Sequence, residues 1–249
     1  MNSINQSLKS SNPDIDLYIF LFALNYSFWH ITVAFLNIEI KNQFMVAELF
    51  DFFTPVVMTL LIVKLFFILL PAGRFWPRVN KVALIILFLG IIFFIEGHGM
   101  HLSANAITRH LAGKEYTDIF KLTYFFDEIL GHLLWDGGFI LISIGFICSV
   151  YKEAPPIQQR NWKLLIPASL LYGFTMFCMA VEGQTVAMTL PVSIVFLLFL
   201  SPKVFMKARD RVHSIIVFYL ISYAVGLLLF IYWFVRNNGF PEFSELGWI

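Results

Sequence analysis

One segment of the chain, FIEGHGMHLSAN, carries histidines at a spacing that brings their side chains together. On an α-helix, His98, His101 and Asn105 fall within an arc of about 60°. Glu96 falls on nearly the opposite face, although the glycines that flank His98 would let a neighbouring backbone approach closely. An imidazole can bind a metal ion or exchange a proton near neutral pH. This face is therefore a candidate catalytic or metal-binding surface.

A second segment, FDEILGHLLWD, carries acidic residues and a histidine in a regular series. Glu128, His132 and Asp136 follow one another at steps of four residues, which places them on one helical face with Trp135 at its edge. A carboxylate and an imidazole one turn apart can bind the same metal ion. We expect the two helices to be neighbours, with His98 facing His132.

Together the two segments predict a metal-dependent site. The expected metal ligands are His98, His101, Glu128 and His132, and the expected general acid or base is Asp127 or Asp136. Imidazoles with a carboxylate suit zinc, iron or manganese better than Ca²⁺ or Mg²⁺, and zinc is favoured among these divalent metals. Zinc with an open coordination position activates water. We therefore predict an enzyme, a metal-dependent hydrolase that acts on a lipid or other amphipathic substrate.

Other polar residues either support this site or have simpler structural roles. The expected supporting residues are Glu96, Asn105, Glu182 and His30. The simpler expectations are an interhelical hydrogen bond for His30 and solvation in a hairpin for Glu182. Glu48 and Asp51 are expected to cap a helix N-terminus, and His213 is expected to be solvated.

The composition predicts that these residues lie in a membrane protein. Of the 249 residues, 59% are hydrophobic and 13% are charged, whereas soluble domains carry about 25% charged residues. Mean hydropathy is +0.78. Seven segments suffice, or nearly so, to cross a hydrocarbon core about 30 Å thick: Leu17–Leu36, Phe52–Leu70, Val82–Ala106, Ile129–Tyr151, Leu164–Val181, Val186–Leu200 and Ile215–Val235. The predicted fold is an all-α, polytopic integral membrane bundle of seven transmembrane helices, with six spans and a re-entrant segment as the alternative.

Two links between the predicted spans have features of their own. A single helix over residues 164–200 would be roughly 55 Å long, so a tight hairpin is expected at Glu182–Thr185. The link between the third and fourth spans contains Tyr116–Phe125, which mixes aromatic and charged residues. We expect this stretch to form a short interfacial helix.

The basic residues predict the orientation of the bundle. Eleven of the 17 lysines and arginines lie in the N-terminal tail or in the links after spans 2, 4 and 6, which the positive-inside rule places in the cytoplasm. Residues 1–16 are then a cytoplasmic tail, residues 17–235 the seven-helix transmembrane domain, and residues 236–249 an extracytoplasmic tail. The candidate site lies in the outer half of the membrane.

Other functions remain open from the residues alone. Two histidines on facing helices could bind haem axially in a membrane electron carrier. The acids and histidines could also serve a proton- or cation-coupled transporter or a receptor. The expected partners are the lipid bilayer and an amphipathic small molecule. The net charge of +1 gives no reason to expect nucleic acid, and the oligomeric state is left open.

The architecture is similar to that of two families whose motifs this chain lacks. Microbial rhodopsins have seven spans, but the seventh span here, Ile215–Val235, contains no lysine for a retinal Schiff base. The intramembrane hydrolases that include alkaline ceramidases and progestin/adipoQ receptors hold zinc among seven spans, but the chain has no His-x-x-x-His. Neither similarity assigns a role to a residue of this sequence.

Overall fold

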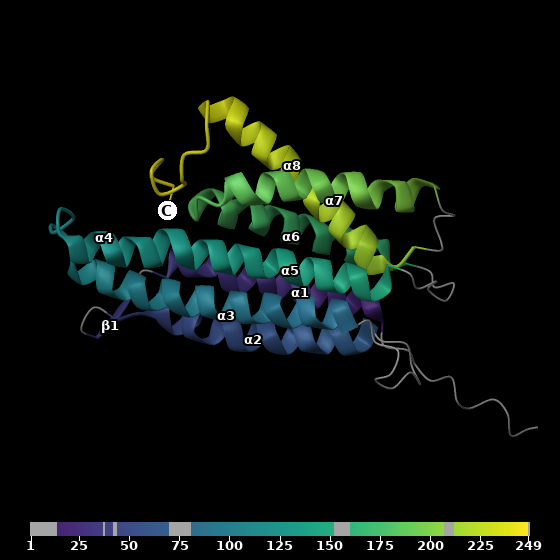
Figure 1. The fold of residues 1–249 in the computed structure, drawn as a ribbon, viewed down its shortest axis with the longest axis horizontal. Coiled ribbons are helices and arrows are strands. Elements are labelled where there is room, and N and C mark those ends of the chain that lie inside the picture. Colours follow the sequence, from purple (N-terminus) through teal and green to yellow (C-terminus); the bar gives the residue numbers. More distant parts are fainter. Residues whose placement is uncertain are drawn as a thin grey trace, which may run out of the picture.

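Long apolar segments form helices that run along most of the molecule (Figure 1). The computed structural model describes residues 14–36, 38–41, 44–69, 81–151, 160–206 and 212–248. Within these residues, seven helical segments are long and apolar enough to cross a membrane. They are built on α1 (Ile15–Ile31), α2 (Val46–Leu69), α3 (Lys81–His110), α5 (His132–Val150), α6 (Trp162–Glu182), α7 (Val186–Met206) and α8 (Ser214–Asn237). The predicted seven-span, all-α membrane fold is confirmed.

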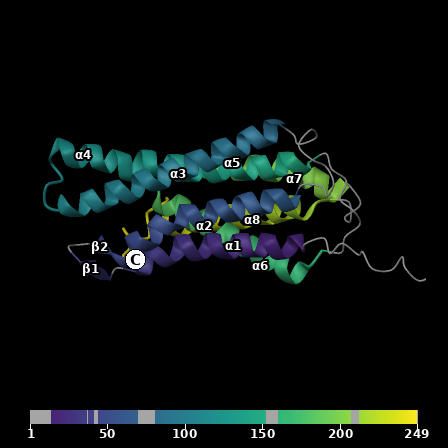
Figure 2. The ribbon, with the colours of Figure 1, turned by 90° about the horizontal axis from the view of Figure 1, so that it is seen from below.

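Shorter elements gather toward one end of the bundle. They are the 3₁₀ turn η1 (Thr32–Phe35), the antiparallel strands β1 (Glu39–Lys41) and β2 (Phe44–Met45), and the helix α4 (Asp118–Tyr124). Figures 1 and 2 both place α4, the two strands and the C-terminal tail toward the same end. This end is called the α4 end below.

The orientation of the bundle in the membrane stays a prediction. Most of the basic residues that predict it lie outside the described residues, as do the first 13 residues of the expected cytoplasmic tail. The basic residues concerned are Lys9, Arg74, Arg78, Lys152, Lys207, Arg209 and Arg211. The α4 end is the one that the sequence predicts to be extracytoplasmic.

Helices α3 and α5 lie against each other at backbone distance because glycines line the contact. A Cβ atom added at Gly90 would lie 2.7 Å from the backbone nitrogen of Ile142, and one added at Gly138 would lie 2.5 Å from that of Phe94. A Cβ atom at Gly97 would collide with the backbone nitrogen of Trp135. Small residues permit this close packing of membrane helices. The contact fixes the depth at which the polar segments of α3 and α5 meet.

The fourth span is longer than predicted, and part of it is a π-helix. It runs without a break from Asp118 to Val150, through α4, the π-helical segment η3 (Phe125–Gly131) and α5. The short helix predicted at Tyr116–Phe125 is present as α4 and continues into the fourth span without a break, while its position at the membrane interface stays a prediction. A π-helix changes which side chains share a face, and such segments are frequent at functional sites.

The hairpin between α6 and α7 lies where it was predicted. The backbone N–H of Gly183 donates to the carbonyl of Met179 at 2.8 Å, and that of Thr185 donates to the carbonyl of Ala180 at 2.9 Å. Gln184 turns the chain with a φ of 54°. The sixth span is a complete helix, so the alternative of a re-entrant segment is not needed.

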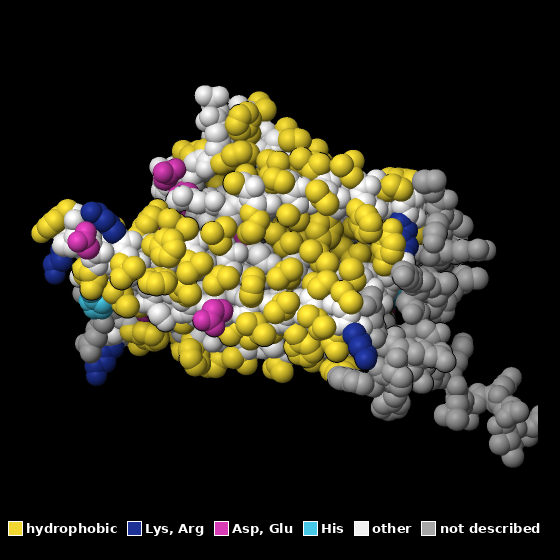
Figure 3. Space-filling model, in the orientation of Figure 1, with side chains coloured by type: hydrophobic (Ala, Val, Ile, Leu, Met, Phe, Trp, Pro, Cys, Tyr) yellow, Lys and Arg dark blue, Asp and Glu magenta, His cyan; other side chains and the backbone are white. Residues whose placement is uncertain are grey.

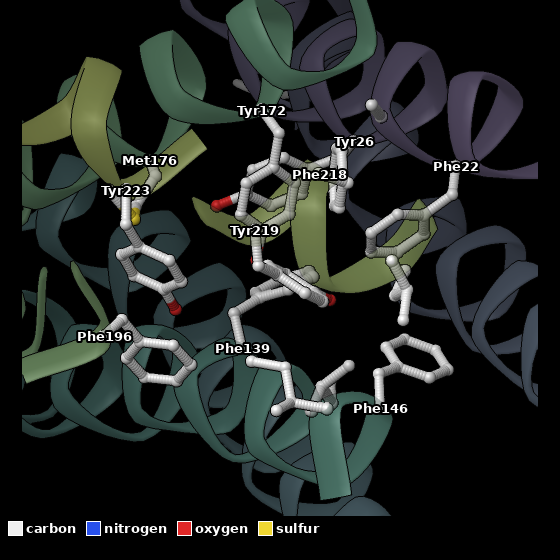
Figure 4. Packing of buried hydrophobic residues seen from close by; sticks show 14 of the residues in the cluster. Phe22, Tyr26, Phe139, Phe146, Tyr172, Met176, Phe196, Phe218, Tyr219 and Tyr223 are labelled. Carbon is white, nitrogen blue, oxygen red and sulfur yellow. The ribbon is translucent and has the colours of Figure 1, made fainter. Parts of the chain in front are cut away.

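The middle of the bundle is packed with aromatic rings (Figure 4). Tyr172 stacks on Tyr26 with 4.7 Å between the ring centroids, which joins α6 to α1. Tyr223 stacks on Phe196 at 4.3 Å, which joins α8 to α7. Outside this core, hydrophobic side chains cover most of the face in Figure 3, while lysines and arginines lie toward the two ends. The lateral surface is therefore suited to contact the lipid bilayer.

Candidate functional site

Four histidines surround the indole of Trp135 toward the α4 end of the bundle. They come from three helices, because His30 lies on α1, His98 and His101 lie on α3, and His132 begins α5. Their ring centroids lie 4.2 Å (His98), 5.3 Å (His30), 5.5 Å (His101) and 5.7 Å (His132) from that of Trp135. We had expected Trp135 at the edge of the polar face, but it occupies the centre of the histidine cluster.

Two of these histidines are held by backbone carbonyls. His98 Nε2 donates to the carbonyl of Asp51 at 2.7 Å, and His30 Nδ1 donates to the carbonyl of Tyr26 at 2.7 Å. The interhelical hydrogen bond expected for His30 is therefore replaced by one within α1. The other ring nitrogens, His98 Nδ1 and His30 Nε2, are buried and have no hydrogen-bond partner among the described residues. Both are left as hydrogen-bond acceptors.

His101 forms a close pair with a buried carboxylate. Its Nδ1 lies 2.8 Å from Oδ1 of Asp127, which is 2% exposed. Thr108 also donates a long hydrogen bond of 3.5 Å to Asp127 Oδ2. Asp127 belongs to the π-helical segment, so the altered turn helps to bring it to α3. The structure brings together these two residues of the predicted site.

His132 lies close to Glu128, as predicted, and to His101, which was not predicted as its nearest histidine. Its Nε2 lies 3.7 Å from Oε2 of Glu128, four residues earlier, as the spacing predicts. Its ring centroid lies 4.6 Å from that of His101. Since Trp135 lies beside His98, the α3 histidine nearest to His132 is His101 rather than the expected His98.

The predicted metal ligands do not converge on one point. Among the residues that the structure describes, no three histidine, cysteine, aspartate or glutamate side chains are placed to hold one ion. Trp135 fills the space between the rings, and Asp51 and Asp127 already engage His98 and His101. The donors in this arrangement do not fit a bound metal. The divalent metal stays a prediction.

Asp136, a predicted catalytic residue, lies apart from the cluster. It is buried, and its Oδ2 accepts a hydrogen bond from the hydroxyl of Thr185 at the start of α7. Asp136 is not among the described residues that line the cavity below. Its observed contact links α5 to α7.

Glu182, which we expected to be solvated, holds the C-terminal tail against the bundle. Its Oε2 accepts hydrogen bonds from the backbone N–H groups of Phe243 at 2.8 Å and Ser244 at 3.3 Å. The side chain of Gln184 donates to the adjacent Glu242. Burial, and then the neighbouring carboxylate of Glu182, raise the pKa of Glu242 above its usual value. Glu182 is therefore partly covered by the tail, while Gln184 in the same hairpin is exposed.

The aromatic residues of the tail pack on α8. The Trp233 indole donates to the carbonyl of Pro241 at 3.0 Å, and its ring lies 4.7 Å from Phe243 and 5.2 Å from Trp248. The guanidinium of Arg236 lies 5.6 Å from the ring of Trp248. The tail thus forms one wall of the site.

A cavity of about 860 Å³ connects these parts. Its inner wall includes His30, His101, His132 and Trp135, and its outer wall includes the tail. Predicted residues that line it are His30, His101, Asn105, Glu128, His132 and Glu182. Glu96, by contrast, is exposed on the outside of α3, as its position on the opposite helical face predicted.

Five charged residues that line the cavity were missed by the sequence analysis as site residues: Glu48, Asp51, Arg109, Arg236 and Glu242. Glu48 caps α2 as expected, because its Oε2 accepts from the backbone N–H of Met45 at 2.9 Å. Its Oε1 also pairs with Arg109 at 2.5 Å, and Asp51 lines the same cavity. The sequence feature that could have indicated this part of the site is the pair of acids Glu48 and Asp51, one helical turn apart at the start of a span. The ion pair between Arg109 and Glu48 joins residues that are distant in the sequence, so no local sequence pattern predicts it.

Comparison with known proteins assigns the chain to a protein family. The family model described as ceroid-lipofuscinosis neuronal protein 6 matches residues 7–238. A similar protein from the dog, Canis lupus familiaris, is the ceroid-lipofuscinosis neuronal protein 6 homolog, with 30% identity over 94 residues. That alignment covers 36% of this chain and 29% of the dog protein. No solved structure matches the chain. Because the family model spans nearly all of the membrane bundle, this chain belongs to the ceroid-lipofuscinosis neuronal protein 6 family.

Proposed function

We propose that this polytopic membrane protein binds an amphipathic molecule, a lipid or a lipid-like compound, in the cavity at its α4 end. The observation that carries the proposal is the shape and lining of that cavity. It is about 860 Å³ in volume and extends from the histidine cluster to side chains on the lateral surface. Ligand pockets commonly measure about 300–1,000 Å³ and combine apolar walls with a few polar groups.

The two kinds of wall suit the two parts of an amphipathic molecule. Phe174, Phe177 and Leu229 provide an apolar side for a hydrocarbon chain, whereas Glu128 and His132 provide a polar side. Burial of hydrocarbon against such side chains is favourable by about 25 cal/mol per Å². The polar groups at the other side would fix the orientation of a headgroup.

The exposed lining residues support entry from the membrane. Phe174 on α6 is 47% exposed and Tyr232 on α8 is 54% exposed. Both lie within predicted membrane spans and line the cavity. A lipid could therefore pass sideways from the bilayer without leaving an apolar environment. With the orientation predicted from the sequence, it would come from the extracytoplasmic leaflet.

Photochemical cross-linking tests this proposal. The protein is placed in phosphatidylcholine nanodiscs that contain a phospholipid with a diazirine in its acyl chain, and the cross-linked residues are identified by mass spectrometry. We expect adducts on Phe177 and Trp233, which are 3% and 2% exposed and line the cavity. Adducts confined to lipid-facing residues such as Leu198, which is 71% exposed, would contradict the proposal.

A second candidate function, hydrolysis of the bound molecule, is favoured by the pair of His101 and Asp127. The Asp127 carboxylate lies 2.8 Å from Nδ1 of the His101 imidazole, and its charge stabilises the protonated ring that forms when Nε2 accepts a proton. Water would add to an ester carbonyl while His101 accepts its proton, and the proton would then pass to the departing alcohol oxygen. The zinc-dependent form of this hydrolase, and the haem, transport and receptor alternatives, stay predictions.

The hydrolase proposal is tested with a fluorogenic long-chain ester. Asp127→Asn keeps the side-chain volume but removes the charge that stabilises protonated His101, so we expect a loss of hydrolysis of about 100-fold or more. Asp118→Asn on the exposed part of α4 is the matched control. Equal hydrolysis by both variants and the wild type would contradict a role for this pair. Elemental analysis of protein purified without a chelator or polyhistidine tag tests the metal.

A further inference from the structure

The charges in the cavity are unevenly divided. The acids that line it are Glu48, Asp51, Glu128, Glu182 and Glu242, and the arginines that line it are Arg109 and Arg236. Arg109 is paired with Glu48 at 2.5 Å, which leaves four acids and one arginine. The cavity is therefore acidic and favours positively charged headgroups.

The remaining arginine is directed toward the tail. One guanidinium nitrogen of Arg236 donates to the hydroxyl of Tyr232 at 2.9 Å, and the group lies against the ring of Trp248. No ion pair between Arg236 and an acid is present among the described residues. Arg236 therefore does not neutralise any acid of the cavity by an ion pair.

Two residues that line the cavity, Asp51 and His30, each contain a buried acceptor atom without a donor. Asp51 is 8% exposed, and its Oδ1 has no hydrogen-bond partner among the described residues. His30 is 3% exposed, and its Nε2 is an acceptor without a partner because Nδ1 donates to Tyr26. A buried polar atom without a partner costs about 1–3 kcal/mol. Of the two side chains, that of Asp51 is 11% exposed and lines the cavity, so a cationic group in the cavity can pair with its carboxylate.

The nearest basic group to Asp51 is already engaged. His98 Nε2 lies 3.8 Å from Asp51 Oδ1, but its hydrogen is directed to the backbone carbonyl of the same residue. The Asp51 carboxylate is therefore not neutralised by this imidazole.

We infer that the preferred ligand of this cavity is a long-chain amphiphile with a primary ammonium headgroup, which binds at the Asp51 carboxylate. An ammonium group has three N–H donors and a positive charge, so it pairs with the Asp51 carboxylate and is attracted by the acidic walls. Its hydrocarbon chain lies along Phe174, Phe177 and Leu229. This inference rests on the proposed function, because it names the chemical class that the same cavity selects.

Competition among matched amphiphiles tests the inference. Octadecylamine, octadecanol and octadecanoic acid have the same chain and differ in the headgroup. Each is added to the nanodiscs described above, and the loss of cross-links on Phe177 and Trp233 is measured. We expect octadecylamine to compete at a concentration at least about tenfold lower than the other two, since one charge-assisted hydrogen bond is worth a factor of this order.

A variant tests the role of Asp51. Asp51→Asn keeps the volume and removes the charge, so we expect the preference for octadecylamine over octadecanol to fall to less than about threefold. Asp118→Asn, an exposed acid on α4, is the control and retains the preference. The order of the three amphiphiles on the wild type is the primary result and does not depend on the stability of the variant.

The outcomes separate this inference from the proposed function. Equal competition, or stronger competition by octadecanoic acid, would overturn the ammonium preference while leaving a lipid-binding cavity. Retention of the preference in Asp51→Asn would overturn the assignment of the ammonium group to this wall. Absence of cross-links on Phe177 and Trp233 in the wild type would contradict the proposed function and this inference with it.

Discussion

The indole of Trp135 lies parallel to the imidazole of His132, with 5.7 Å between the ring centroids and 5° between the ring planes. This contact places the indole inside the histidine cluster. Because Trp135 also contacts the rings of His30 and His98, it joins α1, α3 and α5 into one inner wall of the cavity. The packing of α3 on α5 holds this wall together.

Gly97 is expected to be essential for that packing. A Cβ atom at this position would collide with the backbone of Trp135, whereas nothing lies within 4 Å of a Cβ atom at Gly99. We predict that Gly97→Ala destabilises the protein by about 1–3 kcal/mol, as overpacked positions do, and that Gly99→Ala does not. Thermal unfolding in detergent measures both, and equal midpoints for the two variants would contradict the prediction.

Glu182 is expected to control the position of the C-terminal tail. Glu182→Ala removes an acceptor that binds the backbone N–H groups of Phe243 and Ser244. Charge-assisted hydrogen bonds contribute about 1.5–3 kcal/mol, so we predict faster hydrogen exchange at these two amides. The matched control is Glu115→Ala, in the loop before α4. Unchanged protection of the tail in Glu182→Ala would show that its other contacts suffice.

The hydrogen bond from Thr185 to Asp136 is expected to stabilise the bundle rather than to serve the cavity. Thr185→Val leaves the buried carboxyl of Asp136 without its donor, at a cost of about 1–3 kcal/mol. Cross-linking of lipid to the cavity should persist. Thr189→Val, one turn further along α7 and hydrogen-bonded to the backbone, is the control. Loss of lipid cross-linking with unchanged stability would instead support a direct role for Asp136.

His213 is expected to make stability depend on pH. It caps α8, since its Nδ1 accepts from the backbone N–H of Ile215 at 3.3 Å. Burial, followed by the positive charges of Arg160 and Lys203, lowers the pKa of His213 from 6.5 to about 4. Between these two values the unfolded chain binds more protons than the folded protein. The contribution of neutral His213 to the free energy of unfolding is therefore fully present above pH 6.5 and is lost as the pH falls toward 4.

His213→Asn isolates this effect because asparagine also caps helices but does not titrate. We predict that the unfolding temperature of the wild type falls more steeply between pH 7 and pH 5 than that of the variant. His110→Asn, at an exposed position, should behave like the wild type. Identical pH profiles for His213→Asn and the wild type would contradict the prediction.

The membrane spans could be predicted because hydrophobicity and length are local properties of the sequence. The same holds for the hairpin at Glu182–Thr185 and for the pairing of Glu128 with His132, which depends only on a spacing of four residues. The polar segments of α3 and α5 could be paired because both lie at matching depth. These predictions required no knowledge of how distant side chains pack.

The rest of the site depends on contacts that no local pattern encodes. The π-helical turn that helps to bring Asp127 to His101 has no signature in the sequence. The binding of the tail to Glu182 joins residues of α6 to residues beyond α8. The sequence predicted Trp135 at the edge of a polar helical face. In the structure the backbones of α3 and α5 approach closely at Gly97, and this packing places Trp135 among the histidines.

The amphipathic molecule that accompanies the purified protein tests the central claim most directly. Cys178 lines the cavity, so Cys178→Trp fills part of it, whereas Leu198→Trp adds the same side chain on the exposed surface of α7. After extensive washing in detergent, the bound molecules of each protein are extracted and quantified by mass spectrometry. We predict about one amphipathic molecule per chain for the wild type and Leu198→Trp, and its loss from Cys178→Trp. Equal amounts in all three proteins would contradict a ligand in this cavity.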